Sequence, residues 1–230
     1  MGLSFGDIKD EFVILVRTDK TATRLASAAA AGTANYRDAS LYAVRVGDLL
    51  GRVLKSHAPM VDISEWDLEQ LLPSALGLDH AMVAEVCVEV QTAMNKANGY
   101  GIRAVVPEFD GNRAYGLVEE LKKNPEFVNI EKLFYDQLTY FSQSVVDQSI
   151  RDNAEFQWKS GIKATVVRTT DSEACPWCMN LAGTYNYEDV RDTGNDVWRR
   201  HENCRCTIEY YNGRGGRDVV YMRHPSQNGG

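Results

Sequence analysis

The sequence lacks several features that mark common functional classes. It has no apolar stretch long enough to span a bilayer, and we expect no membrane partner. Its first seven residues lack the basic and apolar regions of a signal peptide, so we expect synthesis in a cytosol. It contains no phosphate-binding loop, no G-x-G-x-x-G, no H-E-x-x-H and no G-x-S-x-G. These absences disfavour a membrane protein, a nucleotide-binding enzyme and the common hydrolases.

Positive charge is in short supply over the chain as a whole. Lys and Arg number 25 against 32 acids, and the net charge of −7 disfavours a protein that binds nucleic acid through bulk charge. The segment from Val197 onward is locally basic, with six arginines against three acids. Two interpretations are open: a solvated surface whose arginines pair with acids elsewhere, or a small contact surface for DNA or an acidic partner. The arginines are Arg199, Arg200, Arg205, Arg214, Arg217 and Arg223.

Cysteine is scarce, and its distribution is uneven. There are five cysteines, an odd number that fits poorly with a fully paired disulfide framework. In a reducing cytosol, clustered cysteines are more typical of a metal site than of disulfides. Cys87 stands apart on an apolar helical stripe between Val83 and Val90, so we expect it to be a small core residue. The other four lie between residues 175 and 206.

Most of the chain has helical periodicity. Apolar residues at three- and four-residue steps predict one long helix over residues 21–56, which Gly32 could weaken. Capping residues and glycines set the bounds of the later helices. The last helix should bury Leu138, Phe141, Val145 and Phe156. The further helices are predicted over residues 65–72, 79–98, 112–123 and 129–159.

The pattern changes after Gly161. Segments rich in β-branched and aromatic residues predict short strands, with a glycine-rich turn before the last one. The expected fold class is therefore α+β, with a mainly α-helical N-terminal body over residues 1–160 that serves docking and assembly. A small, β-rich, zinc-knuckle-like module follows over residues 161–230. The strands are predicted over residues 163–168, 184–187, 207–210 and 218–222, and the turn over residues 213–216.

The cysteine window has the composition of a zinc site. Cys175 and Cys178 form a C-x-x-C pair, and His201, Cys204 and Cys206 follow within six residues of one another. Structural zinc takes four tetrahedral sulfur or imidazole ligands. We favour Cys175, Cys178 and His201 with one of Cys204 or Cys206, which would share a face of an extended strand. A module this small needs such an ion for stability. Thiols that are reduced and merely packed, or two disulfides in an extracellular particle, are the alternatives.

Catalysis is not expected, and no catalytic residue is assigned. Zinc deaminases use H-x-E followed by P-C-x-x-C, and both the order and the spacing fail here. A catalytic zinc ion keeps one position for water, whereas this window offers a surplus of ligands. A metal-dependent nuclease or a toxin-type enzyme stays an alternative, because His201, Asn203 and several arginines are close in sequence. A zinc-stabilised DNA-binding module is a third hypothesis.

Several of these segments resemble the minor capsid, or head morphogenesis, proteins of tailed phages of Gram-positive bacteria, which are akin to the minor head protein of phage Mu. The resemblance is strong over about residues 140–221 and weaker over residues 99–121. It implies a low-copy structural protein of the phage head interior, made in the host cytoplasm, with ejection together with the DNA as an open alternative. The implied partners are portal, major capsid or scaffolding proteins, with oligomers possible. The matching segments are FSQSVVD (141–147), NAEF (153–156), VR (167–168), CPWC (175–178), LAGTY (181–185) and RRHENCRC (199–206).

Overall fold

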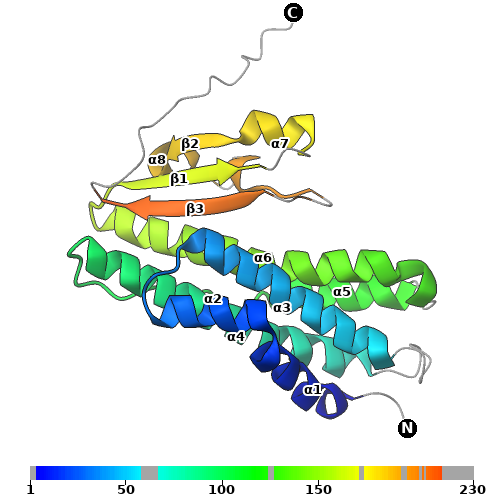
Figure 1. Ribbon diagram of the computed structural model, residues 1–230. Coiled ribbons are helices and arrows are strands. Elements are labelled where there is room, and N and C mark those ends of the chain that lie inside the picture. Colours follow the sequence, from blue (N-terminus) through cyan, green and yellow to red (C-terminus); the bar gives the residue numbers. More distant parts are fainter. Residues whose placement is uncertain are drawn as a thin grey trace, which may run out of the picture.

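The computed structural model describes residues 4–57, 67–123, 127–170, 174–192, 196–201, 204 and 206–213, with the backbone alone for residues 127–134. Long helices form one part of the described structure, and a small sheet lies against them (Figure 1). The elements in chain order are α1 (Phe5–Thr18), α2 (Lys20–Ala30), α3 (Tyr36–His57), α4 (Leu68–Ala97), α5 (Gly111–Lys123), α6 (Phe127–Lys159), β1 (Ala164–Thr169), α7 (Pro176–Leu181), β2 (Gly183–Asn186), α8 (Tyr187–Val190), the 3-10 helix η2 (Asp196–Trp198) and β3 (Thr207–Asn212).

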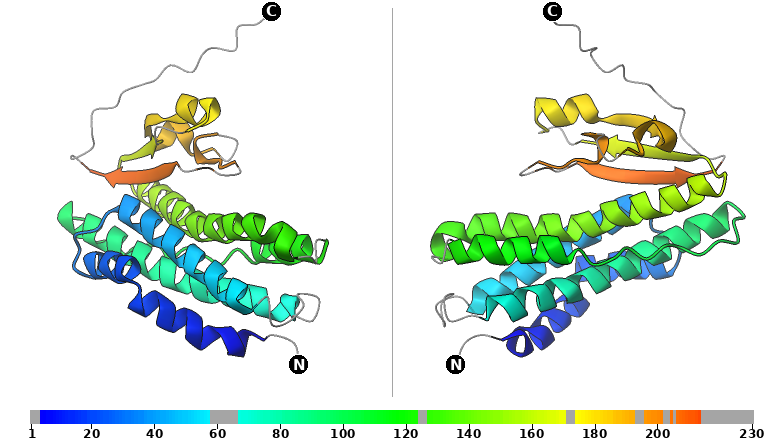
Figure 2. Two further views of the ribbon diagram at one scale, coloured as in Figure 1. Left: turned by 45° about the vertical axis from the view of Figure 1, so that its right-hand side comes forward. Right: turned by 180° about the vertical axis from the view of Figure 1, so that it is seen from behind.

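The sheet lies on one side of the helices, next to α6 in all three views (Figures 1 and 2). Within the described residues its strands are antiparallel in the order β2-β1-β3, and β1 pairs with both neighbours. α7 lies on the outer side of the sheet, whereas α8 reaches α6, where the Tyr187 hydroxyl donates to the Glu155 carboxylate at 2.8 Å. The expected α+β class, a helical body with a small C-terminal sheet, is confirmed.

The first helix, α1, was not anticipated from the sequence. Its buried residues Ile8, Phe12 and Val16 recur every four residues, which places them on one face. The Asp7 carboxylate accepts hydrogen bonds from the Ser4 backbone N–H at 2.8 Å and from the Ser4 hydroxyl at 2.7 Å. This closes the N-terminus of the helix.

The single helix predicted over residues 21–56 is wrong, because two helices, α2 and α3, share this segment. The break follows from the C-terminal cap of α2. Gly32 has φ of 68°, a left-handed conformation that glycine adopts without steric cost. The N–H groups of Gly32 and Thr33 bond back to the carbonyls of Ala29 and Ala28. These bonds end the helical path before Tyr36 begins the next helix.

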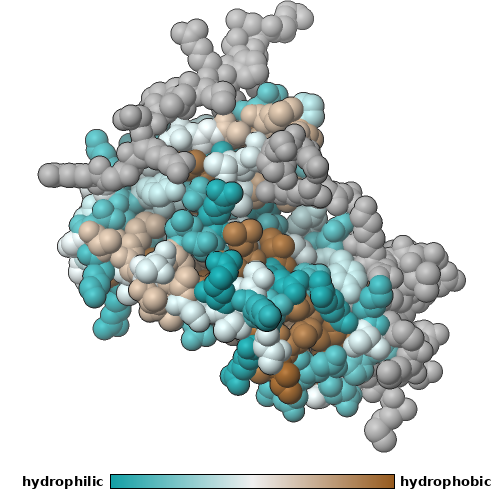
Figure 3. All heavy atoms as spheres, in the orientation of Figure 1, coloured by the Kyte–Doolittle hydropathy of each residue, from teal (hydrophilic) through white to brown (hydrophobic). Residues whose placement is uncertain are grey.

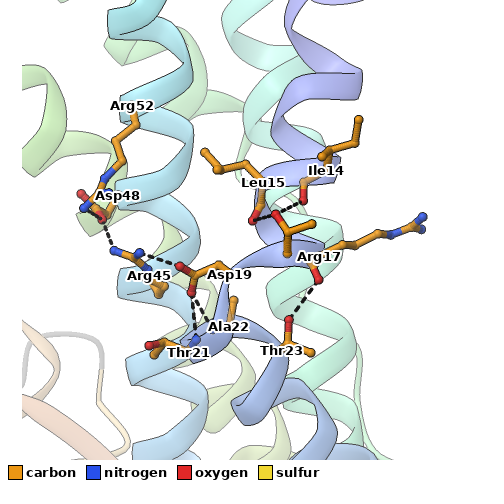
Figure 4. A network of polar contacts seen from close by, with 11 residues as sticks. Ile14, Leu15, Arg17, Asp19, Thr21, Ala22, Thr23, Arg45, Asp48 and Arg52 are labelled. Carbon is orange, nitrogen blue, oxygen red and sulfur yellow. Dashed lines mark hydrogen bonds and ion pairs between the residues drawn. The ribbon is translucent and has the colours of Figure 1, made fainter.

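A charged network fixes the junction between α1 and α2 against α3 (Figure 4). The Asp19 side chain caps α2 by accepting the N–H of Ala22 at 2.9 Å, and it also accepts Arg45 of α3 at 2.6 Å. Arg45 further pairs with Asp48 at 2.7 Å. The Arg45 hydrogen bond lowers the pKa of Asp19 to about 2. This side chain is therefore ionised at neutral pH, where it acts as helix cap and ion-pair partner at once.

The two helices predicted over residues 65–72 and 79–98 are one helix, α4, which runs through Pro73. Residues 58–66 lie outside the described residues. Proline removes one backbone hydrogen bond from a helix. Here the buried stripe continues on both sides of it, through Leu72, Ala75 and Leu76. Packing of this stripe outweighs the lost hydrogen bond.

α4 also has the length and composition to cross a membrane, contrary to the sequence-based expectation. Its most apolar 18-residue window has a mean hydropathy of 1.4, and half of that window is buried inside the protein. A core helix passes the same test. The buried polar residues Asp79, Gln91 and Asn95 are directed into the protein, and α4 packs on α3 and α6. The apolar face of α4 is thus used within the bundle.

α3 lies close against α6 at two glycines. A Cβ on Gly47 would lie 2.9 Å from Thr139 Cα and 3.0 Å from the Leu138 carbonyl oxygen. A Cβ on Gly51 would meet the Tyr135 ring at 2.5 Å. Backbone atoms of α6 therefore occupy the space that a side chain at position 47 would need.

Buried polar side chains join the sheet to the helices. Asn212 of β3 donates to Asn95 of α4 at 2.8 Å and to Gln157 of α6 at 2.9 Å. The Tyr210 hydroxyl donates to the same Gln157, and Gln157 donates to Asn95 at 2.7 Å. Val166 and Ile208 of the sheet belong to the same apolar cluster as the helical core. The two parts of the chain thus share one interior.

The smaller predictions have mixed outcomes. The strands predicted over residues 163–168 and 207–210 correspond to β1 and β3. The strand predicted over residues 184–187 corresponds to β2, but it ends at Asn186, because Tyr187 begins α8. Leu138, Phe141 and Val145 are buried as expected, whereas Phe156 is 42% exposed. That prediction is wrong because Phe156 borders a groove outside the core. The strand over residues 218–222, and all of the turn except Gly213, lie outside the described residues.

Candidate metal centre

The first half of the centre is built by the start of α7. Cys175 is the N-cap residue, and Pro176 takes the first helical position, where its missing N–H is not needed. The Cys175 sulfur accepts the backbone N–H of Cys178 at 3.4 Å. The C-x-x-C motif is therefore a helix N-terminus whose first turn brings both sulfurs to one side.

The second half comes from the segment that leads from η2 into β3. The N–H of Cys204 bonds to the His201 carbonyl at 3.1 Å, which forms a tight turn between these two residues. Cys206 directly precedes Thr207, the first residue of β3. Because β1 pairs with β3 and leads toward α7, the sheet brings both halves to the same end. Residues 202, 203 and 205 lie outside the described part of the chain.

All five expected ligands meet there, in two groups that share Cys178. The donor atoms of Cys175, Cys178 and His201 lie within 4.8 Å of one another, as do those of Cys178, Cys204 and Cys206. The His201 Nε2 atom is 3.2 Å from the Cys175 sulfur and 2.8 Å from the Cys178 sulfur. The sulfurs of Cys178 and Cys204 are 3.8 Å apart.

One of these distances fits a tetrahedral zinc ion as it stands. Two thiolates on one zinc lie about 3.8 Å apart, and a thiolate and an imidazole nitrogen about 3.6 Å, given the usual bond lengths. The Cys178–Cys204 separation equals the first value. The imidazole is closer to both sulfurs than the second value, so His201 must shift outward to admit an ion. A hollow of about 370 Å³, lined by Cys175, Trp177, Arg199, Arg200 and His201, offers that room.

The surroundings divide the thiols by charge state. Hydrogen bonding from Cys206 lowers the pKa of Cys204 to about 4, and Arg200 and Arg168 add to this effect. The same bond raises the pKa of Cys206. The N–H of Cys178 lowers the pKa of Cys175, whereas burial raises that of Cys178. Since the thiolate is the metal-binding form, Cys175 and Cys204 are the readiest ligands.

Sequence reasoning missed Arg168, which belongs to the same site. It lies on β1, is 1% exposed, and donates from Nη2 to the sulfurs of Cys178 and Cys204 at 3.8 and 3.7 Å. Its guanidinium also stands 5.5 Å from the centre of the Trp177 ring. The available signal was the single charged residue of β1, which follows Val166 and Val167. The sequence does not tell which partner such a charge has.

Cys87 and the two described histidines other than His201 do not belong to this site. Cys87 is fully buried in the helical core, as expected. His57 pairs with Glu11 at 2.9 Å, and His80 packs against the Phe109 ring at 5.6 Å. His224 is outside the described residues.

Two of the six C-terminal arginines can be placed, and both pair with acids. Arg199 contacts Asp196 at 2.9 Å, and Arg200 contacts Asp147 at 2.5 Å while donating to the Cys206 carbonyl at 2.6 Å. These two arginines agree with the first interpretation of the basic segment, in which its arginines pair with acids. Arg205, Arg214, Arg217 and Arg223 lie outside the described part of the chain.

The five cysteines are free thiols, four of them gathered at this one end of the sheet. The donor set, its burial and its separations are those of a site that can hold one metal ion. Comparison with models of known protein families, with curated protein sequences and with solved structures finds no match to this chain.

Proposed function

We propose that the cluster binds one zinc ion in a structural role, through Cys175, Cys178, His201 and one of the two remaining cysteines. The observation that carries the proposal is the convergence of five sulfur and imidazole donors from two separate segments. When bound, zinc supplies a fixed tetrahedral link between those segments, and such sites contribute on the order of 10–16 kcal/mol in zinc-finger peptides. α7 has few other anchors: Cys178 belongs to a small apolar cluster of cysteines separate from the main core.

Zinc content tests this proposal. We expect about one zinc ion per chain in the purified protein, and a loss of most of it in Cys178→Ser, since Cys178 belongs to both donor groups. Cys87→Ser is the matched control, because this buried cysteine lies in the helical core and should leave the zinc content unchanged. Elemental analysis of the three proteins gives the result. Absence of metal from the wild type, or equal content in both variants, would contradict the proposal.

At the level of the organism, we propose a structural role in the head of a tailed phage. The support is the sequence resemblance over residues 140–221, which includes the zinc ligands. A further support is a helical body with a small module attached, a design that offers long faces for docking to portal, capsid or scaffolding proteins. Mass spectrometry of purified procapsids and mature heads tests the role. The chain should be present in at least one of the two, and its absence from both would contradict it.

One observation favours a second candidate, a metal-dependent nuclease. The hollow beside Cys175 and His201 brings solvent and two arginines, Arg199 and Arg200, to the exposed side of the site. Incubation of plasmid DNA with the wild type and with His201→Ala, in the presence of divalent metals, separates the candidates. Cleavage by the wild type alone would favour the nuclease. Intact DNA in both samples would leave the structural role.

A further inference from the structure

Arg168 is a buried cation on the central strand of the sheet. At 1% exposure it is among the largest fully buried side chains of the described structure. Burial of a guanidinium without compensation is strongly unfavourable. Its contacts therefore show which groups compensate the buried positive charge.

Only part of that compensation comes from oxygen. Nη1 donates to the carbonyls of Val197 at 2.6 Å and Arg199 at 2.8 Å. These groups are neutral dipoles. Among the described residues Arg168 makes no ion pair with a carboxylate, and the Asp147 carboxylate is paired with Arg200. The described groups that can bring negative charge to Arg168 are the sulfurs that it contacts.

The remaining contacts are to sulfur. Nη2 donates to the sulfurs of Cys178 and Cys204, at 3.8 and 3.7 Å. Zinc bound by three thiolates and a neutral imidazole carries a net charge of −1, which a single guanidinium balances. Zinc bound by four thiolates carries −2, which one guanidinium balances only in part. The ligand set with His201 is thus the one that matches Arg168 in charge.

We propose that Arg168 is the positioning residue of the zinc site: it balances the charge of the zinc–thiolate group and holds Cys204, rather than Cys206, as the fourth ligand. The inference rests on the proposed zinc function. Residues that hydrogen-bond to metal ligands orient them and raise metal affinity. Arg168 does so from the rigid centre of the sheet, where β1 is paired on both edges.

Zinc affinity of Arg168 variants tests the charge-balancing role. Competition with a chelator should show about 10- to 100-fold weaker zinc binding in Arg168→Met, the range typical for loss of such a partner. Arg168→Lys keeps the positive charge but not the planar guanidinium, so its zinc affinity should lie between those of the wild type and Arg168→Met. Arg45→Met is the control, because Arg45 is a partly buried, ion-paired arginine of the helical body far from the cluster in the fold. It should leave zinc affinity unchanged.

A thermal measurement separates charge balance from simple packing. Arg168→Met should lower the Tm of the zinc-loaded protein more than that of the chelated protein, because weaker zinc binding removes part of the stabilisation that bound zinc gives the folded state. A role in packing alone would lower both equally, with unchanged zinc affinity, and would overturn the inference while the zinc site stands. A wild type that binds no zinc would overturn the proposed function itself, and the inference with it.

Cobalt substitution tests the choice of Cys204. The intensity of thiolate-to-cobalt charge transfer reports the number of bound thiolates. Cys204→Ser should lose about one third of that intensity if three thiolates bind, whereas Cys206→Ser should keep it. The reverse pattern would assign Cys206 and overturn this part of the inference.

Discussion

Asp79 shows how far a single residue can depart from its ordinary chemistry inside this fold. Its side chain is completely buried on α4, where Oδ1 accepts the Ser142 hydroxyl of α6 at 2.8 Å. Oδ2 has no hydrogen-bond partner among the described residues. Burial raises the pKa of Asp79 to about 8. The carboxyl group is therefore mostly protonated at neutral pH, which spares the core an uncompensated charge.

This shift makes stability depend on pH. In the unfolded chain the carboxyl loses its proton near pH 4, and in the folded chain only near pH 8, so the folded state binds more protons between these values. The contribution is fully present below about pH 4, and it is lost as the pH rises toward 8. Asp79→Asn should remove this decline, as measured by urea denaturation from pH 5 to 8.

The matched control is Asp10→Asn, at an exposed position of α1. Relative to this control, the Asp79→Asn protein should gain stability steadily as the pH rises. A difference between the two variants that stays constant over the range would show that Asp79 does not titrate in this way.

At the scale of elements, the contact between α3 and α6 depends on the absence of a side chain at Gly47. Leu138 and Thr139 bring backbone atoms of α6 to within 3.0 Å of where its Cβ would stand. Backbone atoms cannot rotate aside as a side chain can. One methyl group therefore has to push two helices apart, or strain both.

Gly47→Ala should destabilise the protein by about 1–3 kcal/mol, the usual range for overpacking. Gly77→Ala is the matched control: it also lies inside a helix, α4, but nothing lies within 4 Å of its Cβ. This substitution should stabilise by about 0.5–1 kcal/mol, because alanine loses less conformational freedom than glycine. Urea midpoints of the two variants should move in opposite directions. A shift of both in the same direction would contradict the close-contact explanation.

Element prediction from the sequence succeeded where local signals agreed with packing. The helix predicted over residues 112–123 is found as Gly111–Lys123, and that over 129–159 as Phe127–Lys159. The prediction failed where tertiary contacts determine the bounds of a helix. The predicted helix over residues 65–72 ends directly before Pro73, yet burial on both sides of this proline keeps α4 continuous. The split between α2 and α3 depends on the left-handed conformation of Gly32. In the sequence, a glycine within a helical pattern indicates only a weakened helix.

At the candidate site, the five candidate ligands could be predicted from the sequence, whereas the arginine that contacts their sulfurs could not. Cys175, Cys178, His201, Cys204 and Cys206 belong to two compact motifs, which made them visible without a structure. Arg168 lies in neither motif. Its role depends on the sheet register, which sets β1 beside β3 and brings its guanidinium to the sulfurs.

At the scale of the whole molecule, helices and sheet share a core but differ in what anchors them. Polar and apolar groups are interspersed over the face shown in Figure 3, with apolar patches between charged side chains on the helical half. α3 and α4 bury long apolar stripes in the main core. α7 buries only Cys178 and Leu181. The outer part of the module should therefore depend on zinc more than the bundle does.

Removal of zinc by a chelator should speed amide hydrogen exchange in α7 and β2, and leave α3 and α4 nearly unchanged. The reason is that the proposed zinc ion would link α7 to the segment before β3, whereas the bundle keeps its own packing. Mass-spectrometric hydrogen exchange measures this by segment. In Cys178→Ser the chelator should have no further effect. A uniform rise over all helices would show that the whole molecule depends on the ion.

The central position of β1 has a consequence for how the chain folds. Its partner β2 is near in sequence, but Thr169 of β1 meets Thr207 of β3 across 38 residues. Closure of a short loop precedes that of a long one, so we expect the β1–β2 hairpin to form before β3 docks. During translation, Cys175 and Cys178 thus leave the ribosome before His201, Cys204 and Cys206 do. Until the later donors are made, the two thiols lack the rest of the cluster and are open to oxidation.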